Sequence, residues 1–517
     1  MRIDELPCHD TEVLVVGAGP TGLMAGLVLS HRDVPAIVLD TKSGPTRESR
    51  ALAVQARSME IYDQLGLAEE IAARANPARG VQIGGRSAGV DVRGAQRGAT
   101  RFPGLAIFEQ SHNEELLVRT LRQRDADLRF GHRVIEIQMP DAPPGADPTH
   151  LAAVEPGPVI ALVDGPDGLY RIRARWCIGA DGAGSPVRHQ LDVPFEGVTD
   201  EARFWVADLR GATGVPDHEV SLHFGHVSFG ISFPIGPNGH VRLISLASGE
   251  SIRQDEALAV AGSDLGITAR SVEWFSTYQV HHRVARHFRI GPVFLAGDAA
   301  HVHSPVGGQG MNTGLQDAHN LANLLGDIHA GIRDAAAVDL YERERRPVAE
   351  HLINATDRLF GIVGRPGRMA AGLRRRFGRV AGLLVPRIVG SGAGHRAAGL
   401  IGQYRIRYPV TTGSGVPEWA DDPVVGRRLP PVGENQAALR TFSWQLHSYG
   451  AVPQARPGDP SPPPDGKGTL PAWLERPVRH EPTPSGPFSA ERLYLVRPDG
   501  FVVAAPALRD GEIRAQD

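Results

Sequence analysis

Residues 11–40 read TEVLVVGAGPTGLMAGLVLSHRDVPAIVLD. The apolar run that ends at Val16 predicts a buried parallel strand, and the apolar spacing after the glycines predicts a helix. Between them lie Gly17, Gly19 and Gly22, which have the GxGxxG spacing of a dinucleotide-binding turn. This order of strand, glycine turn and helix predicts a Rossmann-like unit near the start of the chain.

A second β-branched run completes this unit and ends at Asp40. Glycines have no side chains, so backbone N–H groups can approach a pyrophosphate at the N-terminus of the helix. A carboxylate at the end of the second strand accepts hydrogen bonds from ribose hydroxyls. The unit therefore predicts a dinucleotide site, although by itself it does not distinguish FAD from NAD.

A second glycine-rich turn lies at residues 175–191, RWCIGADGAGSPVRHQL, and follows another predicted strand. Its centre is Asp181–Gly182, and no strand–helix–strand unit of Rossmann length surrounds it. We therefore expect one dinucleotide fold in the chain and no second one for a nicotinamide cofactor. On local grounds alone, Asp181 is also explained as the residue that closes an Asx-type turn.

A third stretch, residues 297–312, reads GDAAHVHSPVGGQGMN and follows the apolar run PVFLA. Beyond it, leucines and alanines recur with helical spacing, so the glycines bring backbone N–H groups and a positive helix end towards a ligand. NAD needs no such element this far along the chain. FAD does, because its ribityl chain and isoalloxazine ring extend beyond the pyrophosphate and a helix N-terminus stabilises negative charge on the reduced ring.

A metal centre is the competing interpretation of the third stretch, because Asp298, His301 and His303 could form a two-histidine, one-carboxylate iron site. Such ligands normally come from separated strands, and the glycines would then have no purpose. The two cysteines, Cys8 and Cys177, do not form a CxxC pair, which argues against a zinc cluster and dithiol chemistry. We therefore expect no metal.

The three stretches together resemble the class A FAD-dependent aromatic hydroxylases, the group of para-hydroxybenzoate, phenol and polyketide hydroxylases. The resemblance extends from about residue 11 to about residue 360. It implies an α/β fold with a Rossmann-like FAD-binding domain, an inserted antiparallel-sheet substrate domain and a thioredoxin-like C-terminal domain, shortened in this chain. It also implies that FAD binds tightly and noncovalently.

The resemblance assigns flavin contacts to all three stretches and to two segments between them. Asp40 would hold the adenosine ribose, where the family more often has Glu, and Asp298 would bind the ribityl chain. Asp181 would touch FAD and help to admit the nicotinamide. The expected FAD contacts are Gly17, Gly19, Pro20, Thr21, Gly22, Asp40, Arg47, Arg50, Gln110, Asp181, Gly182, Gly297, Asp298, Pro305, Gly308, Gly310, Met311 and Asn312.

The activity that the resemblance implies is hydroxylation of a small aromatic molecule of the phenolic or polyketide type. NADPH or NADH would bind transiently and reduce the flavin, and O2 would then form a flavin C4a-hydroperoxide that hydroxylates the ring. Two alternatives share the FAD fold: another FAD-dependent oxidoreductase, such as an oxidase or dehydrogenase, and a noncatalytic flavin-containing ligand-binding protein.

Substrate selection is expected in residues 191–284, where EVSLHFGHVSFGISFPIGPNGHVRLISL alternates like antiparallel strands joined at GPNG. One face of this hairpin and one residue of the third stretch supply the candidate substrate contacts Phe229, Ile231, Phe233 and Pro305. A plain core face explains the hairpin residues equally well. No general base is identifiable, and His223 and His226 are weak catalytic candidates.

These assignments divide the chain into four expected domains. The divisions are an FAD-binding domain at 1–190 and 285–365, a substrate domain at 191–284 joined by part of 80–110, a helical connector at 366–404, and a thioredoxin-like domain at 405–517. The last domain contains a strand–turn–strand pattern around Pro498–Asp499–Gly500. Because it has no CxxC pair, we expect a structural or dimerising role for it and no redox role.

The composition argues against several other classes. The 517 residues include 55 Lys and Arg against 58 Asp and Glu, a formal net charge of −3, so no basic field favours nucleic acid. The first residues lack the apolar core of a signal peptide, and no run reaches the roughly 20 apolar residues of a membrane span. We therefore expect a cytoplasmic monomer or homodimer whose partners are O2 and a small aromatic molecule.

Overall fold

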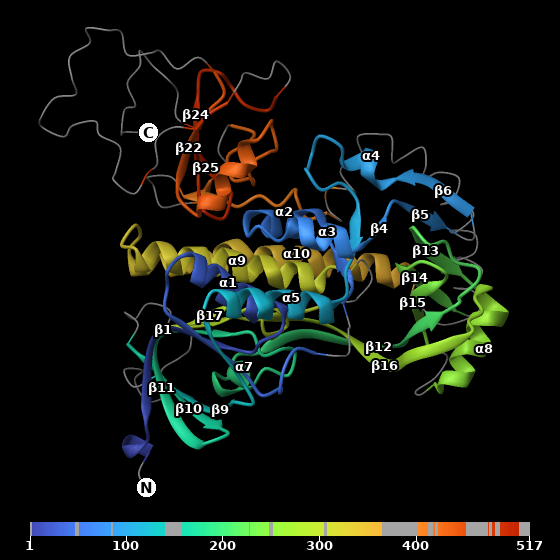
Figure 1. Ribbon diagram of the computed structural model, residues 1–517, viewed down its shortest axis with the longest axis horizontal. Coiled ribbons are helices and arrows are strands. Elements are labelled where there is room, and N and C mark those ends of the chain that lie inside the picture. Colours follow the sequence, from blue (N-terminus) through green and yellow to red (C-terminus); the bar gives the residue numbers. More distant parts are fainter. Residues whose placement is uncertain are drawn as a thin grey trace, which may run out of the picture.

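The structure of the chain is a computed structural model with two large sheets, helices packed on them and a C-terminal unit (Figure 1). The residues that it describes are 3–46, 51–83, 86–139, 157–226, 228–247, 252–303, 308–363, 399, 402–411, 417–418, 422–450, 474, 478–480 and 486–505.

The first large sheet has parallel strands at its centre. These strands are β1 (Cys8–Val16), β2 (Ala36–Asp40), β8 (Asp127–Phe130), β11 (Gly168–Gly179) and β18 (Val293–Leu295), with β9 (Arg133–Gln138), β10 (Val159–Gly165) and β17 (Arg289–Ile290) added antiparallel. The parallel order is β18–β11–β1–β2–β8. Val13, Leu14 and Val15 of β1 are fully buried, as expected for a parallel strand covered on both faces. The carboxyl ends of β1, β11 and β18 meet at one edge.

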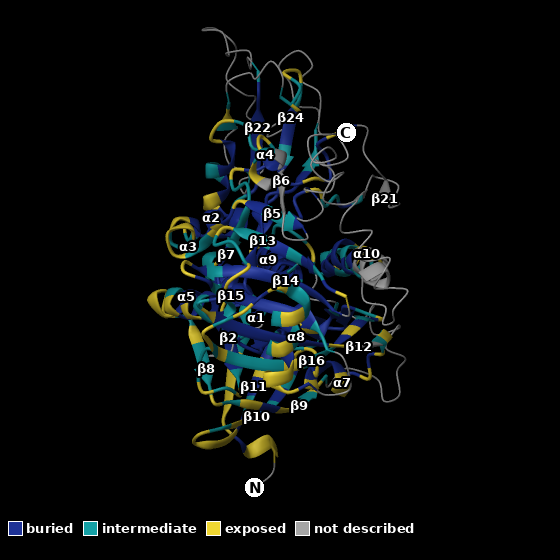
Figure 2. Ribbon diagram, turned by 90° about the vertical axis from the view of Figure 1, so that its right-hand side faces the viewer, coloured by how far each residue is buried: buried dark blue, intermediate teal, exposed yellow. Residues whose placement is uncertain are grey.

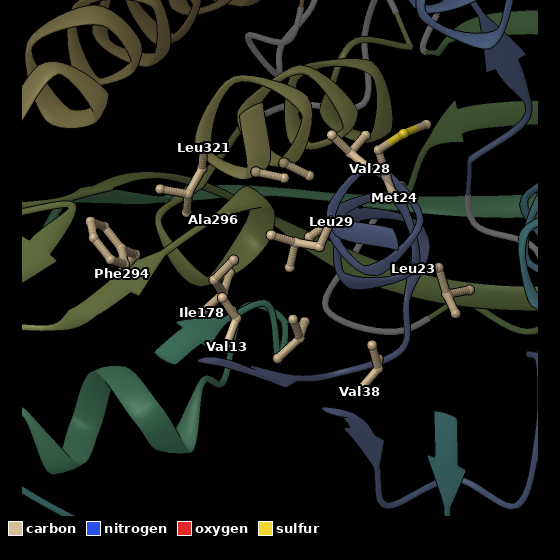
Figure 3. Close-up of a cluster of buried hydrophobic side chains, with 14 of the residues drawn as sticks. Val13, Leu23, Met24, Val28, Leu29, Val38, Ile178, Phe294, Ala296 and Leu321 are labelled. Carbon is tan, nitrogen blue, oxygen red and sulfur yellow. The ribbon is translucent and has the colours of Figure 1, made fainter. Parts of the chain in front are cut away.

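Three helices pack together beside this sheet: α1 (Pro20–His31), α5 (Gln110–Gln123) and α9 (Gly310–His329). Every residue of α1 from Gly22 to Leu29 is buried, because α1 lies between the strands and α9. Its apolar side chains meet Val38 of β2 on one side and Leu321 of α9 on the other (Figure 3). Gly26 permits this approach, since a Cβ atom there would lie 2.7 Å from Val38 Cγ2.

The second large sheet is mainly antiparallel. Its strands are β5 (Gly80–Ile83), β6 (Arg86–Asp91), β12 (Phe195–Arg210), β13 (Glu219–Phe224), β14 (Phe229–Gly236), β15 (His240–Leu246), β16 (Ser271–Ala285) and β19 (His301–Val302), in the order β19–β16–β12–β15–β14–β13–β5–β6. Helix α8 (Gln254–Leu265) packs on one face over Trp205 and Leu243. The opposite face carries Phe229 and Ile244 and packs against Leu52, which precedes β3 (Ala53–Val54).

Smaller elements connect these layers. They are η1 (Ile3–Glu5), β3 (Ala53–Val54), α2 (Ala56–Gln64), α3 (Ala68–Arg74), β4 (Asn76–Ala78), α4 (Val92–Gln96), β7 (Leu105–Ile107), α7 (Pro186–Gln190), η2 (Gly297–Ala299), η3 (Ala335–Val338) and α10 (Asp339–Val363). Burial is continuous through α1 and α9, whereas α3 and α5 expose one side (Figure 2).

Among the described residues, no helix combines the length and the apolar character that a membrane span requires.

The C-terminal unit, which we call the tail, comprises the described residues from 402 onward. It contains β20 (Val410–Thr411), β21 (Pro417–Glu418), η4 (Asn435–Thr441), β22 (Gln445–Ser448), β23 (Val478–Arg479), β24 (Leu493–Val496) and β25 (Val502–Ala504), with sheet order β23–β22–β24–β25. The tail lies against α2 and α9 (Figure 1). β24 and β25 form the hairpin expected around Asp499. The predicted connector lies almost wholly outside the described residues, and the thioredoxin-like fold and the domain boundaries stay predictions.

Candidate active site

Glycine contacts bring the three sequence motifs together at the edge where β1, β11 and β18 end. Gly17 has a φ of +105°, and a Cβ atom there would lie 2.3 Å from the carbonyl oxygen of Ala180. Gly297 has a φ of +59°, and its Cβ would lie 2.5 Å from Thr21 Oγ1. Both the backbone conformation and the close approach require glycine. The turns after these strands therefore pack directly on one another.

A cavity of about 1280 Å³ runs along this edge and reaches the second sheet. The predicted FAD contacts that line it are Gly17, Gly19, Pro20, Thr21, Asp40, Gln110, Asp181, Gly182, Asp298, Gly308, Gly310 and Met311. One predicted substrate contact, Phe233, also lines it. The predicted site residues that do not are Gly22, Gly297, Asn312, Phe229, Ile231, His223 and His226. Arg47, Arg50 and Pro305 lie outside the described residues.

Asp40 is held at the end of β2 by two backbone donors, one in the glycine turn and one just after the strand. Its Oδ2 accepts a hydrogen bond from the Ala18 N–H at 2.6 Å, and its Oδ1 accepts one from the Lys42 N–H at 2.8 Å. The Lys42 ammonium lies 3.8 Å from the same carboxylate. This places the acid beside the pyrophosphate turn, where ribose recognition requires it.

Gln110 is oriented by a buried acid that the sequence motifs did not identify. Gln110 Nε2 donates to Glu114 Oε1 at 2.9 Å, and Glu114 Oε2 accepts from the Thr46 N–H at 2.7 Å. Glu114 is fully buried and lines the cavity. Its helical spacing with Leu117 and Leu121 was visible in the sequence, and an acid on such an apolar face was the signal that could have found it.

Asp181 lines the cavity and also caps α7. Its Oδ1 accepts from Ser185 Oγ at 2.5 Å and its Oδ2 from the Val187 N–H at 2.9 Å. Burial raises the pKa of this carboxyl, and these hydrogen bonds oppose the rise. Arg188, which the motifs did not single out, donates to Ala183 O and to Ala299 O at 2.8 and 3.0 Å. It thereby ties the second motif to the third.

His301, the first histidine after Asp298 in the sequence, pairs with a buried acid and does not line the cavity. His301 Nε2 lies 2.7 Å from Asp317 Oδ2, and the same oxygen accepts from the Gly297 N–H at 3.1 Å. Arg345 Nε donates to the other carboxylate oxygen of Asp317 at 2.7 Å. Asp298 itself lines the cavity. The third motif therefore divides into one acid at the cavity and a buried ion-pair network behind it.

Asn312 holds residues 308–310, the described part of the glycine-rich stretch that leads into α9, which we call the glycine loop. Its Oδ1 accepts from the Gln55 N–H at 2.9 Å, and its Nδ2 donates to Ala53 O at 2.7 Å and to Gly308 O at 2.8 Å. Gly308 has a φ of +60°, and its Cβ would lie 3.0 Å from Ala53 Cβ. The loop and the first residues of α9 are thus held with their backbone at the cavity.

The face of the second sheet that is not covered by α8 forms the other wall of the cavity. The apolar and aromatic lining residues from this face are Val206, Phe233, Ile244, Trp274, Tyr278 and Val280. Phe229 and Ile231 belong to the same apolar cluster, and they pack in the core behind the lining. This wall offers an apolar and aromatic surface to a flat ligand.

The two candidate histidines lie away from this wall. His223 is buried on the α8 side of the sheet, and its Nε2 lies 2.9 Å from Ser232 Oγ. Burial lowers the pKa of His223 to about 4, so it is neutral at neutral pH. The His226 N–H donates to Asp264 Oδ1. Neither histidine lines the cavity, so the geometry gives neither a route to a proton of the substrate.

The cavity suits FAD at each chemical part of that molecule. A Cβ atom on Gly19 would meet no protein atom within 4 Å, so space for a pyrophosphate lies directly over the turn. Asp40 lines the cavity beside the same turn, and a carboxylate in this position suits ribose hydroxyls. At the other end, Gly310 and Met311 line the cavity with the N-terminal turn of α9, which favours a negatively charged ring edge.

The comparisons with known proteins agree with this geometry. The profile of the FAD binding domain family matches residues 10–356. The chain is 30% identical to the 12-dehydrotetracycline 5-monooxygenase/anhydrotetracycline 6-monooxygenase of Streptomyces rimosus subsp. rimosus, over 96% of this chain and 95% of that protein.

Solved structures also resemble the chain over nearly its full length. The OxyS anhydrotetracycline hydroxylase from Streptomyces rimosus has a TM-score of 0.75 and 27% identity, and it covers 96% of both chains. CabE, an aromatic hydroxylase from angucycline biosynthesis, has a TM-score of 0.75 and 28% identity over 96% of both chains. These findings confirm the predicted α/β fold, the FAD cofactor and the monooxygenase class. The chain therefore belongs to the FAD binding domain family and is an FAD-dependent aromatic hydroxylase that uses NAD(P)H.

Proposed function

We propose that the chain hydroxylates a polycyclic aromatic molecule of the polyketide type. The observation that carries this proposal is the wall formed by Phe233, Trp274 and Tyr278, which shares one cavity with the FAD-binding turns. Similarity to tetracycline and angucycline hydroxylases over 96% of the chain, tail included, supports it. A broad apolar wall favours a flat multi-ring substrate over a single small ring.

Each part of the site has a task in this reaction. FAD, once reduced by NAD(P)H, supplies activated oxygen, of which one atom enters the aromatic ring and the other leaves as water. Val206, Phe233 and Ile244 hold the ring and exclude water, which would otherwise divert the oxygen into hydrogen peroxide. No histidine base is assigned, and the substrate's own hydroxyl group activates its ring. The proposal includes a cytoplasmic enzyme that acts as a monomer or a homodimer.

Anaerobic stopped-flow reduction of the bound flavin tests the proposal. NADPH and NADH are mixed with the enzyme in the presence of single-ring phenols, naphthols and polycyclic polyketide phenols. We expect a polycyclic phenol to accelerate reduction and, in air, to gain one oxygen atom by mass spectrometry. Acceleration by single-ring phenols alone, or by none of the panel, contradicts the proposal.

Two phenylalanines of β14 provide a matched pair for the substrate wall. Phe233 lines the cavity, whereas Phe229 belongs to the same apolar cluster behind it. We expect Phe233→Leu to raise KM for the accelerating phenol roughly five- to tenfold, because about 1 kcal/mol of ring contact is lost. Phe229→Leu leaves KM unchanged. Equal KM values for both variants would show that the wall containing Phe233 does not bind the substrate.

A further inference from the structure

The first segment of the tail, residues 402–408, packs against the glycine loop, and we call this segment the strap. At its start, Gly402 O accepts from the Arg57 N–H at 3.2 Å. In its middle, Tyr404 O accepts from Arg428 Nε at 3.2 Å. At its end, the Tyr408 hydroxyl accepts from Arg345 Nη1 at 2.9 Å. The strap is therefore anchored at both ends to the FAD-binding part.

Gln403 of this strap reaches the loop that lines the cavity. Its Nε2 donates to Gln309 Oε1 at 3.1 Å and to Thr313 Oγ1 at 2.8 Å, and its Oε1 accepts from Gln316 Nε2. Gln403 and Gln309 are both buried, and Gln309 lines the cavity. Both polar atoms of the Gln403 side-chain amide thus form hydrogen bonds with the glycine loop or with the first turns of α9.

The backbone of Gln403 is held in an unfavourable conformation. Its φ of +54° lies in the left-handed region, which is disfavoured for residues other than Gly, Asn and Asp. The other non-glycine residues with positive φ in the described part of the chain are Asp33, Asp125, Asp192 and Asn238, whose side chains tolerate that region, and Phe442, which ends η4. A strained glutamine persists only where its surroundings fix it, and strain of this kind is characteristic of functional sites.

Gln309 determines how the chain enters α9. Its carbonyl oxygen accepts from the Thr313 N–H at 2.9 Å and from Thr313 Oγ1 at 3.0 Å. Asn312 fixes the loop on the side of β3, and Gln403 fixes it on the side of the tail. The loop conformation therefore depends on a residue about 90 positions away, outside the segment matched by the FAD binding domain profile.

We propose that Gln403 is a positioning residue for the flavin, by which the tail sets the conformation of the glycine loop through Gln309. The inference concerns FAD binding and does not depend on the identity of the aromatic substrate. It also gives the tail a part in the active site in addition to its contribution to stability.

The test uses Gln403→Gly, which removes the amide but suits the left-handed backbone. The purified holoenzyme is deflavinated, and FAD affinity is measured by titration of flavin fluorescence. We expect the Kd for FAD to rise about tenfold, as for the loss of one or two net hydrogen bonds. The melting temperature of the FAD-free protein stays near that of the wild type, and more hydrogen peroxide is released per NAD(P)H oxidised.

Asp192→Gly is the matched control, because Asp192 is an exposed residue with a φ of +51° that does not line the cavity. We expect it to leave FAD affinity and peroxide release unchanged. A double variant with Gln309→Ala should bind FAD no more weakly than Gln309→Ala alone. Three results would overturn the proposal. The first is wild-type FAD affinity in Gln403→Gly, and the second is a fall in the melting temperature of the FAD-free protein as large as that of the holoenzyme. The third is an additive loss of FAD affinity in the double variant.

Discussion

Two glycines of one motif have different physical roles. Gly17 needs its φ of +105° and lies against the Ala180 carbonyl, so Gly17→Ala forces a backbone shift within the protein. We expect it to lower the free energy of unfolding of the FAD-free protein by about 2 kcal/mol or more. Gly19 has an ordinary φ of −79° and empty space around its Cβ position. Gly19→Ala should therefore preserve stability and weaken FAD binding at least tenfold, because the methyl group occupies the pyrophosphate space.

Urea unfolding of the FAD-free variants and titration with FAD measure these two quantities separately. Normal FAD affinity in Gly19→Ala would mean that the pyrophosphate does not lie over this turn. Wild-type stability in Gly17→Ala would mean that the contact with Ala180 is not structurally required.

Helix α9 is the element on which the third motif depends, and its Asp317 faces a fully buried Arg345. Asp317→Asn leaves that guanidinium without its anion, so we expect the free energy of unfolding to fall by roughly 3–5 kcal/mol. Glu70→Gln is the control, since Glu70 pairs at the surface with Arg74 and Arg119, and such exposed pairs contribute about 1 kcal/mol or less each. Urea unfolding at pH 7 compares the two variants, and similar losses in both would contradict the assignment.

The same carboxylate predicts a pH dependence. Burial alone would raise the pKa of Asp317, but the Arg345 guanidinium and His301 outweigh it and hold the pKa at about 2, below its ordinary 3.8. Its stabilising contribution, about 2 kcal/mol, is therefore fully present above pH 3.8 and is lost as the pH falls towards 2. We expect the free energy of unfolding of Asp317→Asn to depend less on pH between pH 3.8 and 2 than that of the wild type. Urea unfolding across this pH range measures it, and an equal pH dependence in the two proteins would contradict the prediction.

α9 also shows which features the sequence could predict. The spacing of Leu315, Ala318 and Leu321 correctly predicted a helix after the glycine loop, because that face packs on α1. The opposite face carries His319 and Asn320, which would ordinarily be solvated. They are buried because α2 and the tail supply hydrogen-bond partners. Those partners lie far away in the sequence, so periodicity could not reveal them.

The same reason explains the site residues that sequence reasoning missed. Gly17, Asp40 and Asp181 follow directly from local motifs, since the backbone near them sets their position. Arg188 and Gln403 act on carbonyl or amide groups about 90 or more residues away. Only the folded chain brings these partners together.

At the scale of the whole molecule, the tail docks on the FAD-binding part through buried polar groups. Arg497 pairs with Glu344 at 2.6 Å, and Arg57 Nη2 donates to Asp499 O at 2.8 Å. Trp444 Nε1 donates to Asp327 Oδ2 at 3.0 Å. Separating the tail would leave these groups without partners, which is costly for buried charges. The two parts are therefore expected to unfold together.

Calorimetry of the full-length chain with and without added FAD tests this coupling. FAD binds only the folded state, so it raises the melting temperature of every part that unfolds cooperatively with its site. We expect one transition that moves as a whole when FAD is added. Arg497→Met leaves Glu344 and Asp499 buried without their cation. It should lower the melting temperature of that transition by an amount that corresponds to roughly 3–5 kcal/mol of unfolding free energy. The opposite result would be two transitions in the wild type, of which FAD shifts only one. The tail would then unfold independently, and its buried ion pairs and hydrogen bonds would connect two separately folding units.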